Sequence, residues 1–153
     1  VEAEFLREIY ERQHNLDAEH DVATRWAVCY GLEAVKRAAL DHFDYDMLTP
    51  WGARIATVEI KCRNSSYLSM IERGGYMISA NRYNNQLIPE QKKGVPVLLL
   101  VGIAGAVYIL PIRRAAPLVS VVGGRTVQTR DKYDVEQVVY IPWEWFTKLV
   151  ERG

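Results

Sequence analysis

The feature that most constrains the fold is a run of eighteen residues without a charged side chain, residues 95–112. Its length meets the minimum for a membrane-spanning helix. However, Pro96 and Pro111 lie within its ends, and both disfavour an uninterrupted helix. Gly102 and Gly105 interrupt its middle, and valine and isoleucine are abundant. We therefore predict two buried β-strands joined by a turn near Gly105, and no membrane association.

The rest of the chain alternates between helical and strand patterns. Apolar residues recur at helical spacing in residues 2–13 and again in residues 17–41, where Asn15 or Asp17 could cap the second helix. Further strands are expected at residues 43–49, 53–62, 76–80, 117–122 and 135–141, and further helices just before Gly74, at residues 82–93, and from Pro142 to the end. This order predicts an α/β fold, in which helices flank a mixed β-sheet.

The composition indicates one globular domain. The chain has 153 residues, of which 49% are hydrophobic and 25% are charged, as is ordinary for a globular protein. With no internal repeat and no long linker, we expect a single domain with a helical N-terminal segment (1–42), a core (43–112) and C-terminal strands and a helix (113–153).

Cysteine usage and the N-terminal sequence bear on the compartment. The two cysteines, Cys29 and Cys62, form no CxxC pair, which disfavours a structural zinc site and suits a reducing environment. No signal-peptide pattern is visible at the beginning of the sequence. We therefore expect a cytoplasmic protein.

The net charge of zero conceals an asymmetry along the chain. Residues 1–50 carry eleven acidic and five basic side chains, a net charge of −6, whereas residues 51–153 carry eight and fourteen, a net charge of +6. The second part could therefore present a surface for a polyanion. The alternative is that the first part is only a solvated, Glu-rich helical segment.

The residues with the most chemical information lie in the expected hairpin of residues 43–63. Glu59 and Lys61 are two residues apart on one strand, so they face the same side. The hairpin could bring Asp46 opposite Glu59, and two neighbouring carboxylates favour a divalent cation. Oxygen ligands suit Mg²⁺ or Mn²⁺. The pattern thus predicts metal-assisted phosphodiester hydrolysis, while the plainer alternative is a surface ion pair between Glu59 and Lys61.

The hairpin resembles the core of the PD-(D/E)XK nuclease superfamily, which has the restriction-endonuclease-like fold. In that family, a helix precedes a β-hairpin that carries an aspartate and then an E/D-x-K motif. Here FDYDM would supply the aspartate and VEIK the motif. The resemblance extends over about residues 17–112, and it implies a phage or prokaryotic endonuclease or resolvase.

The resemblance also implies roles for individual residues. Asp46 and Glu59 would bind Mg²⁺ or Mn²⁺, with the carbonyl oxygen of Ile60 as a third ligand, and Lys61 would position the attacking water. Asp44 is an alternative to Asp46 as the metal ligand.

A further acidic residue on the preceding helix often assists in this family. Glu19 and Asp21 are the candidates, and we favour Glu19 because it shares a helical face with apolar residues. The alternative for both is a solvated acid in the first helical turn.

Several basic and polar residues are candidates for contacts with nucleic acid. Arg82 would lie near the scissile phosphate by the same resemblance, although it could equally be a surface residue. The full set of candidates is Arg63, Asn81, Arg82, Arg125, Arg130 and Lys132. The last three belong to a charged segment that could hold a phosphate backbone or form a solvated loop.

Together these features predict a Mg²⁺-dependent endodeoxyribonuclease that is sequence-specific, of the restriction or homing type, and acts on duplex or branched DNA. A small domain that cuts both strands is expected to form a homodimer or homotetramer. The alternatives are a structure-specific Holliday-junction resolvase and a non-catalytic nucleic-acid-binding or assembly module with the same fold.

Overall fold

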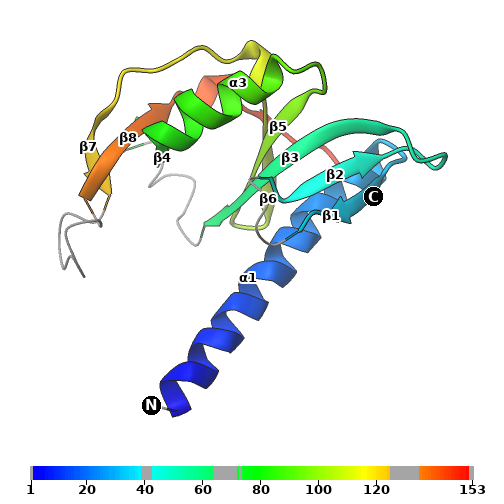
Figure 1. Cartoon of the computed structure of the whole chain (residues 1–153), viewed down its shortest axis with the longest axis horizontal. Helices are drawn as coiled ribbons and strands as arrows, with labels where there is room; N and C mark the ends of the chain where they lie inside the picture. Colours follow the sequence, from blue (N-terminus) through cyan, green and yellow to red (C-terminus); the bar gives the residue numbers. More distant parts are fainter. Residues whose placement is uncertain (1, 39–42, 64–71, 73, 125–134, 152–153) are drawn as a thin grey trace.

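The computed structural model describes residues 2–38, 43–63, 72, 74–124 and 135–151 (Figure 1). In this part of the chain, one long helix and two β-sheets form an α/β fold, as predicted. The helix expected just before Gly74 falls mostly on residues outside those described.

The larger sheet has six described strands in the order β1-β2-β3-β5-β6-β9. Their bounds are β1 Glu33–Lys36, β2 Tyr45–Leu48, β3 Arg54–Arg63, β5 Val97–Ile103, β6 Ala106–Pro111 and β9 Thr147–Lys148. Strands β3 and β5 are parallel, and the other neighbouring pairs are antiparallel. The sheet is therefore mixed, as expected.

The uncharged run of residues 95–112 forms the β5–β6 hairpin of this sheet. Ala104 and Gly105 make its turn, and both have positive φ values, 50° and 80°, which the tight turns between antiparallel strands favour. Alternate residues of β5 belong to two different hydrophobic cores, so the strand is apolar on both faces. Among the described residues, no helix is long and apolar enough to cross a membrane.

A core lies on each face of the larger sheet. On one face, Val22, Ala23 and Trp26 of helix α1 (Glu2–Cys29) pack against β2, β3 and β5. The other face is covered by the smaller sheet, in the order β4-β8-β7, and by two short helices. These elements are β4 Tyr76–Ser79, β7 Val121–Gly124, β8 Val135–Ile141, the π-helix η1 Asn81–Leu87 and α3 Ile88–Gln91.

Helix α1 differs from the two helices expected in residues 2–41. It is continuous through Asn15 and Asp17, and it ends at Cys29. Gly31 has a φ of 66° and the Leu32 N–H donates to the Ala27 carbonyl at 2.9 Å, a glycine-dependent helix end. The chain then turns back to form β1 at the edge of the sheet. The helix expected over residues 17–41 was therefore wrong beyond Cys29, because Glu33–Lys36 forms a strand.

The described residues 142–151 do not form the C-terminal helix expected from Pro142. Trp143–Trp145 forms a single 3₁₀ turn, η3, and β9 then pairs with β6. The ring of Trp143 packs 4.9 Å from that of Phe146 and 5.2 Å from that of Tyr108. The helix was predicted because Pro142 is favourable at the first position of a helix. The aromatic packing and the pairing with β6 instead stabilise a non-helical conformation here.

Candidate active site

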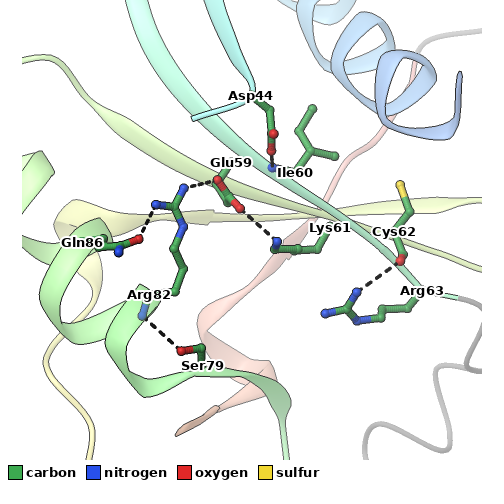
Figure 2. Close-up of polar contacts among 9 residues, drawn as sticks. All are labelled: Asp44, Glu59, Ile60, Lys61, Cys62, Arg63, Ser79, Arg82 and Gln86. Atoms are coloured by element: carbon green, nitrogen blue, oxygen red, sulfur yellow. Dashed lines mark hydrogen bonds and ion pairs between the residues drawn. The ribbon is translucent and has the colours of Figure 1, made fainter. Parts of the chain in front are cut away.

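Glu59, in the middle of β3, is the most buried charged residue of the site. Its side chain is 5% exposed, and Lys61 Nζ lies 3.1 Å from its Oε1. The guanidinium of Arg82 donates to its other oxygen, Oε2 (Figure 2). Burial raises the pKa of Glu59, Lys61 and Arg82 act against this, and the negative charge of Asp44 adds to it. The pair of Glu59 and Lys61 is thus no exposed surface ion pair.

Arg82 reaches Glu59 from η1, on the face of the sheet opposite α1. Its second terminal nitrogen donates to Gln86 Oε1 at 2.6 Å, and its guanidinium carbon lies 4.9 Å from the centre of the Phe43 ring. The backbone N–H of Arg82 lies 3.4 Å from Ser79 Oγ, the hydroxyl of the residue that ends β4. The side chain is therefore held by a carboxylate, an amide and an aromatic ring.

Asp44 lies just before β2, where the hairpin enters the sheet. Its backbone N–H donates to the Val58 carbonyl at 3.0 Å, and its Oδ2 accepts the Ile60 N–H at 2.8 Å (Figure 2). Its charge also contributes to the raised pKa values of both Glu19 and Glu59. The charge of Asp44 therefore acts on both the helix acid and the strand acid.

Asp46 does not lie opposite Glu59, and that prediction was wrong. The register of β2 and β3 pairs it with Thr57, whose hydroxyl donates to Asp46 Oδ1 at 3.2 Å. Arg37 and Arg54 lie 3.3 and 3.9 Å from the same oxygen. Strand β2 also shifts register between Met47 and Leu48, and this shift, together with the tight turn that follows, sets which aspartate reaches Glu59.

The helix acid that reaches this site is Glu19. Burial raises its pKa most, and the Asp44 charge adds to the shift, while Lys36 and Lys61 oppose it. Asp21, the alternative candidate, is 66% exposed and pairs with Arg25 at 3.6 Å. The structure therefore brings Glu19, and not Asp21, into electrostatic contact with Asp44, Glu59 and Lys61.

The backbone of Ile60 also faces Asp44. On β3, the Thr57 N–H points to β5, because it donates to the Pro96 carbonyl at 2.9 Å, and the direction alternates along a strand. The N–H of Ile60 points to the Asp44 side, and its carbonyl shares that direction. The Ile60 carbonyl is accordingly on the side where a ligand role was expected.

The other predicted contacts lie further from Glu59 or outside the described residues. Arg63 is exposed, with its guanidinium carbon 5.4 Å from the centre of the Tyr76 ring. Asn81 is exposed and accepts a hydrogen bond from Asn85 at 3.0 Å. Arg125, Arg130 and Lys132 lie outside the residues that the structure describes.

A comparison with known protein families decides which group this site belongs to. Residues 5–149 match a family described as "Phage putative PDDEXK endonuclease". The chain belongs to this PD-(D/E)XK endonuclease family. The match spans nearly all of the chain, and it confirms both the resemblance of the hairpin and the restriction-endonuclease-like fold. No match was found among curated proteins.

Nucleases of the PD-(D/E)XK family act on DNA and generally use divalent metal ions. Among the described residues, no three acidic, histidine or cysteine side chains form a ready metal cluster. The donor chemistry nevertheless fits such an ion, because Asp44 and Glu59 supply carboxylate oxygens and Ile60 supplies a carbonyl. The buried Glu59 carboxylate already contacts two cationic side chains, Lys61 and Arg82, so its surroundings stabilise positive charge.

Two residues of this candidate site were missed from the sequence. Gln86 lies four residues after Arg82 in a helical segment, so their spacing alone could have indicated the contact. Phe43, which lies under the Arg82 guanidinium, had no such signal, because the contact joins the hairpin to η1 across the fold.

Proposed function

We propose that this protein is a divalent-metal-dependent endodeoxyribonuclease whose site is formed by Asp44, Glu59, Lys61 and Glu19. The observation that carries the proposal is the association of these charges around β3: Lys61 lies 3.1 Å from Glu59, Asp44 accepts the Ile60 N–H, and the Asp44 charge adds to the raised pKa values of Glu59 and Glu19. Mg²⁺ is the ion that we favour and Mn²⁺ the alternative, since all the available donors are oxygens.

The proposed site residues would have different roles in binding the metal and in catalysis. Asp44, Glu59 and the Ile60 carbonyl would hold the ion, and Glu19 would act on it from the helix side. The bound ion would supply Lewis-acid stabilisation of the phosphoryl oxygens and a more acidic water. Lys61, 34% exposed and fixed to Glu59, would orient the attacking water and stabilise the negative charge that develops on the phosphate. The expected products carry 5′-phosphate and 3′-hydroxyl ends.

The proposed substrate is duplex DNA cut at a specific sequence, in the manner of a restriction or homing enzyme. A Holliday junction is the alternative substrate, and a non-catalytic DNA-binding module is the alternative role. Arg82, Arg63 and Asn81, with Arg125, Arg130 and Lys132, are the proposed contacts to DNA. Cutting two strands favours a homodimer or homotetramer, and a DNA substrate of this kind would place the protein in the cytoplasm.

The test compares the wild type with Lys61→Met on supercoiled plasmid, linear duplex and a four-way junction, each with Mg²⁺ or EDTA. We expect Mg²⁺-dependent cleavage by the wild type, and a loss of about 100-fold or more in the variant. The preferred substrate distinguishes the restriction or homing role from the resolvase role. Equal cleavage by both proteins, or none by the wild type, contradicts the proposal.

A further inference from the structure

Arg82 occupies the Glu59 oxygen that a metal ion would need. We propose that Arg82 is a placeholder cation, which a divalent metal displaces from Glu59, and that Gln86 then keeps its guanidinium beside the site to bind a phosphate oxygen of DNA. This inference rests on the proposed function, because it concerns the same carboxylate. The inference adds that Arg82 and the metal compete for Glu59, and that this competition couples metal binding to DNA binding.

The first step of the argument is burial. The side chains of Glu59 and Arg82 are 5% and 14% exposed, so water can screen their interaction only weakly. A buried carboxylate without a partner is strongly unfavourable. Glu59 therefore needs a cationic partner whenever the metal is absent, and Arg82 provides one.

The second step is the division of the two carboxylate oxygens. Lys61 contacts Oε1, while Arg82 contacts Oε2. Asp44 accepts the Ile60 N–H, while both cations contact Glu59 (Figure 2). A metal that binds Glu59 through Oε2 must displace Arg82, because two cations cannot share that position without repulsion. Arg82 should therefore lower the apparent affinity for metal.

The third step concerns where Arg82 goes. Gln86 accepts from the Nη1 atom at 2.6 Å, and the Phe43 ring lies against the guanidinium. Neither contact depends on Glu59, so both can hold the side chain after Glu59 is taken by the metal. A guanidinium has five donors, and its released edge suits a phosphate. Metal and DNA would then each strengthen the binding of the other.

The test uses Arg82→Gln, with Mn²⁺ titrated by calorimetry in the absence of DNA. The variant is expected to bind Mn²⁺ about tenfold more tightly than the wild type, within the usual range of coupling between sites. A merely structural role for Arg82 predicts the opposite sign, since a disordered site binds metal less well.

The second readout is the affinity for a short DNA duplex, measured by fluorescence anisotropy with EDTA or with Ca²⁺. Arg82→Gln should weaken binding in Ca²⁺ by about tenfold more than it weakens binding in EDTA. Gln86→Leu should also weaken binding in Ca²⁺, while its Mn²⁺ affinity stays close to that of the wild type. A loss of DNA affinity in EDTA as large as that in Ca²⁺ would overturn the inference.

Lys93→Gln is the matched control. Lys93 is exposed, lies just beyond α3 and pairs with Glu90 at 3.0 Å. Its removal should change neither the Mn²⁺ affinity nor the DNA affinity. If Arg82→Gln does not fold, Arg82→Lys replaces it. Lysine lacks the planar fork that joins Glu59 to Gln86, so this variant should bind Mn²⁺ more tightly than the wild type by a smaller factor, and equal or weaker binding would overturn the inference.

The outcomes separate this inference from the proposed function. If the wild type binds Mn²⁺ and cleaves DNA but Arg82→Gln binds the ion equally or more weakly, the placeholder role is wrong and the nuclease proposal stands. If the wild type neither binds Mn²⁺ nor cleaves DNA, both fail together.

Discussion

At the scale of single residues, two aspartates of one hairpin have opposite surroundings. Asp44 accepts a backbone N–H from the strand that carries Glu59, and its charge adds to the rise that burial causes in the pKa of Glu59. Asp46 is neutralised by Arg37 and Arg54 and bonded to Thr57. Under the proposed function Asp44 would bind the metal, whereas Asp46 forms ion pairs that stabilise the hairpin.

This difference predicts opposite effects for two matched substitutions. Asp44→Asn keeps an acceptor for the Ile60 N–H but removes the charge, so Mg²⁺-dependent cleavage should fall by about 100-fold, at least as much as when a partner of a metal ligand is lost. Asp46→Asn should keep cleavage close to the wild type but lower the free energy of unfolding by about 1 kcal/mol. Plasmid cleavage rates and urea denaturation measure the two effects. The reverse pattern would assign the metal to Asp46.

At the scale of elements, the contact of α1 with β5 decides how near the helix acid comes to the site. Gly102 lies on β5 at the place where α1 crosses it. A Cβ added there would lie 2.9 Å from Val22 Cγ2 and 3.4 Å from Cys62 Sγ. A glycine is needed at this position because the helix approaches so closely, and the approach brings Glu19 towards β3.

Gly102→Ala is therefore expected to destabilise the fold by about 1–3 kcal/mol, the usual cost of overpacking a core. Val22→Ala should destabilise it too, because Val22 is buried. Gly102→Ala crowds Val22, and Val22→Ala removes the crowded methyl groups. The double variant should therefore lose less free energy of unfolding than the sum of the losses in the two single variants. Urea denaturation of the four proteins checks this, and strictly additive losses would show that Val22 is not the obstacle.

At the scale of the whole molecule, an ion pair joins α1 to the end of the chain. Arg25 contacts the carboxylate of Glu151, 126 residues later, and donates to the Gly105 carbonyl at 2.9 Å. Its hydrogen bond lowers the pKa of Glu151. Three distant segments, namely the helix, the β5–β6 turn and the C-terminal segment after β9, thus meet at one guanidinium. Asp21 of the helix also lies 3.6 Å from it.

The lowered pKa predicts how this contact responds to acid. A carboxyl group whose pKa is lowered by folding stabilises the fold above its unfolded pKa, near 4.5, and loses that effect as the pH falls through the folded value. The wild type should therefore be more stable than Glu151→Gln at neutral pH, and the difference should vanish in acid. Urea midpoints across this range measure it. The exposed Glu144, changed to Gln, is the control, and a difference that persists in acid would contradict the assignment.

Much of the fold followed from local pattern. The two strands of residues 95–112, the hairpin strands β2 and β3, and the strand at Tyr76 were predicted from apolar content and turn residues. The helix boundaries near Asn15 and Cys29 were not predicted. Helix α1 continues through the polar residues near Asn15 because its later residues, which include Val22 and Trp26, pack on the sheet. The prediction of a C-terminal helix was wrong because the pairing of β9 with β6 outweighed the local helix preference.

The sequence by itself determined the family, the hairpin and the pair formed by Glu59 and Lys61, because strand alternation places residues i and i+2 on one face. Only the tertiary structure placed Asp44 at the Ile60 N–H and paired Asp46 with Thr57, because register depends on a turn and a shift that the sequence pattern does not specify. It also left Asp21 exposed and paired with Arg25, and it placed Arg82 on Glu59. The contact of Arg82 with Glu59 joins elements distant in the chain, and its geometry arises only when β3 and η1 pack together.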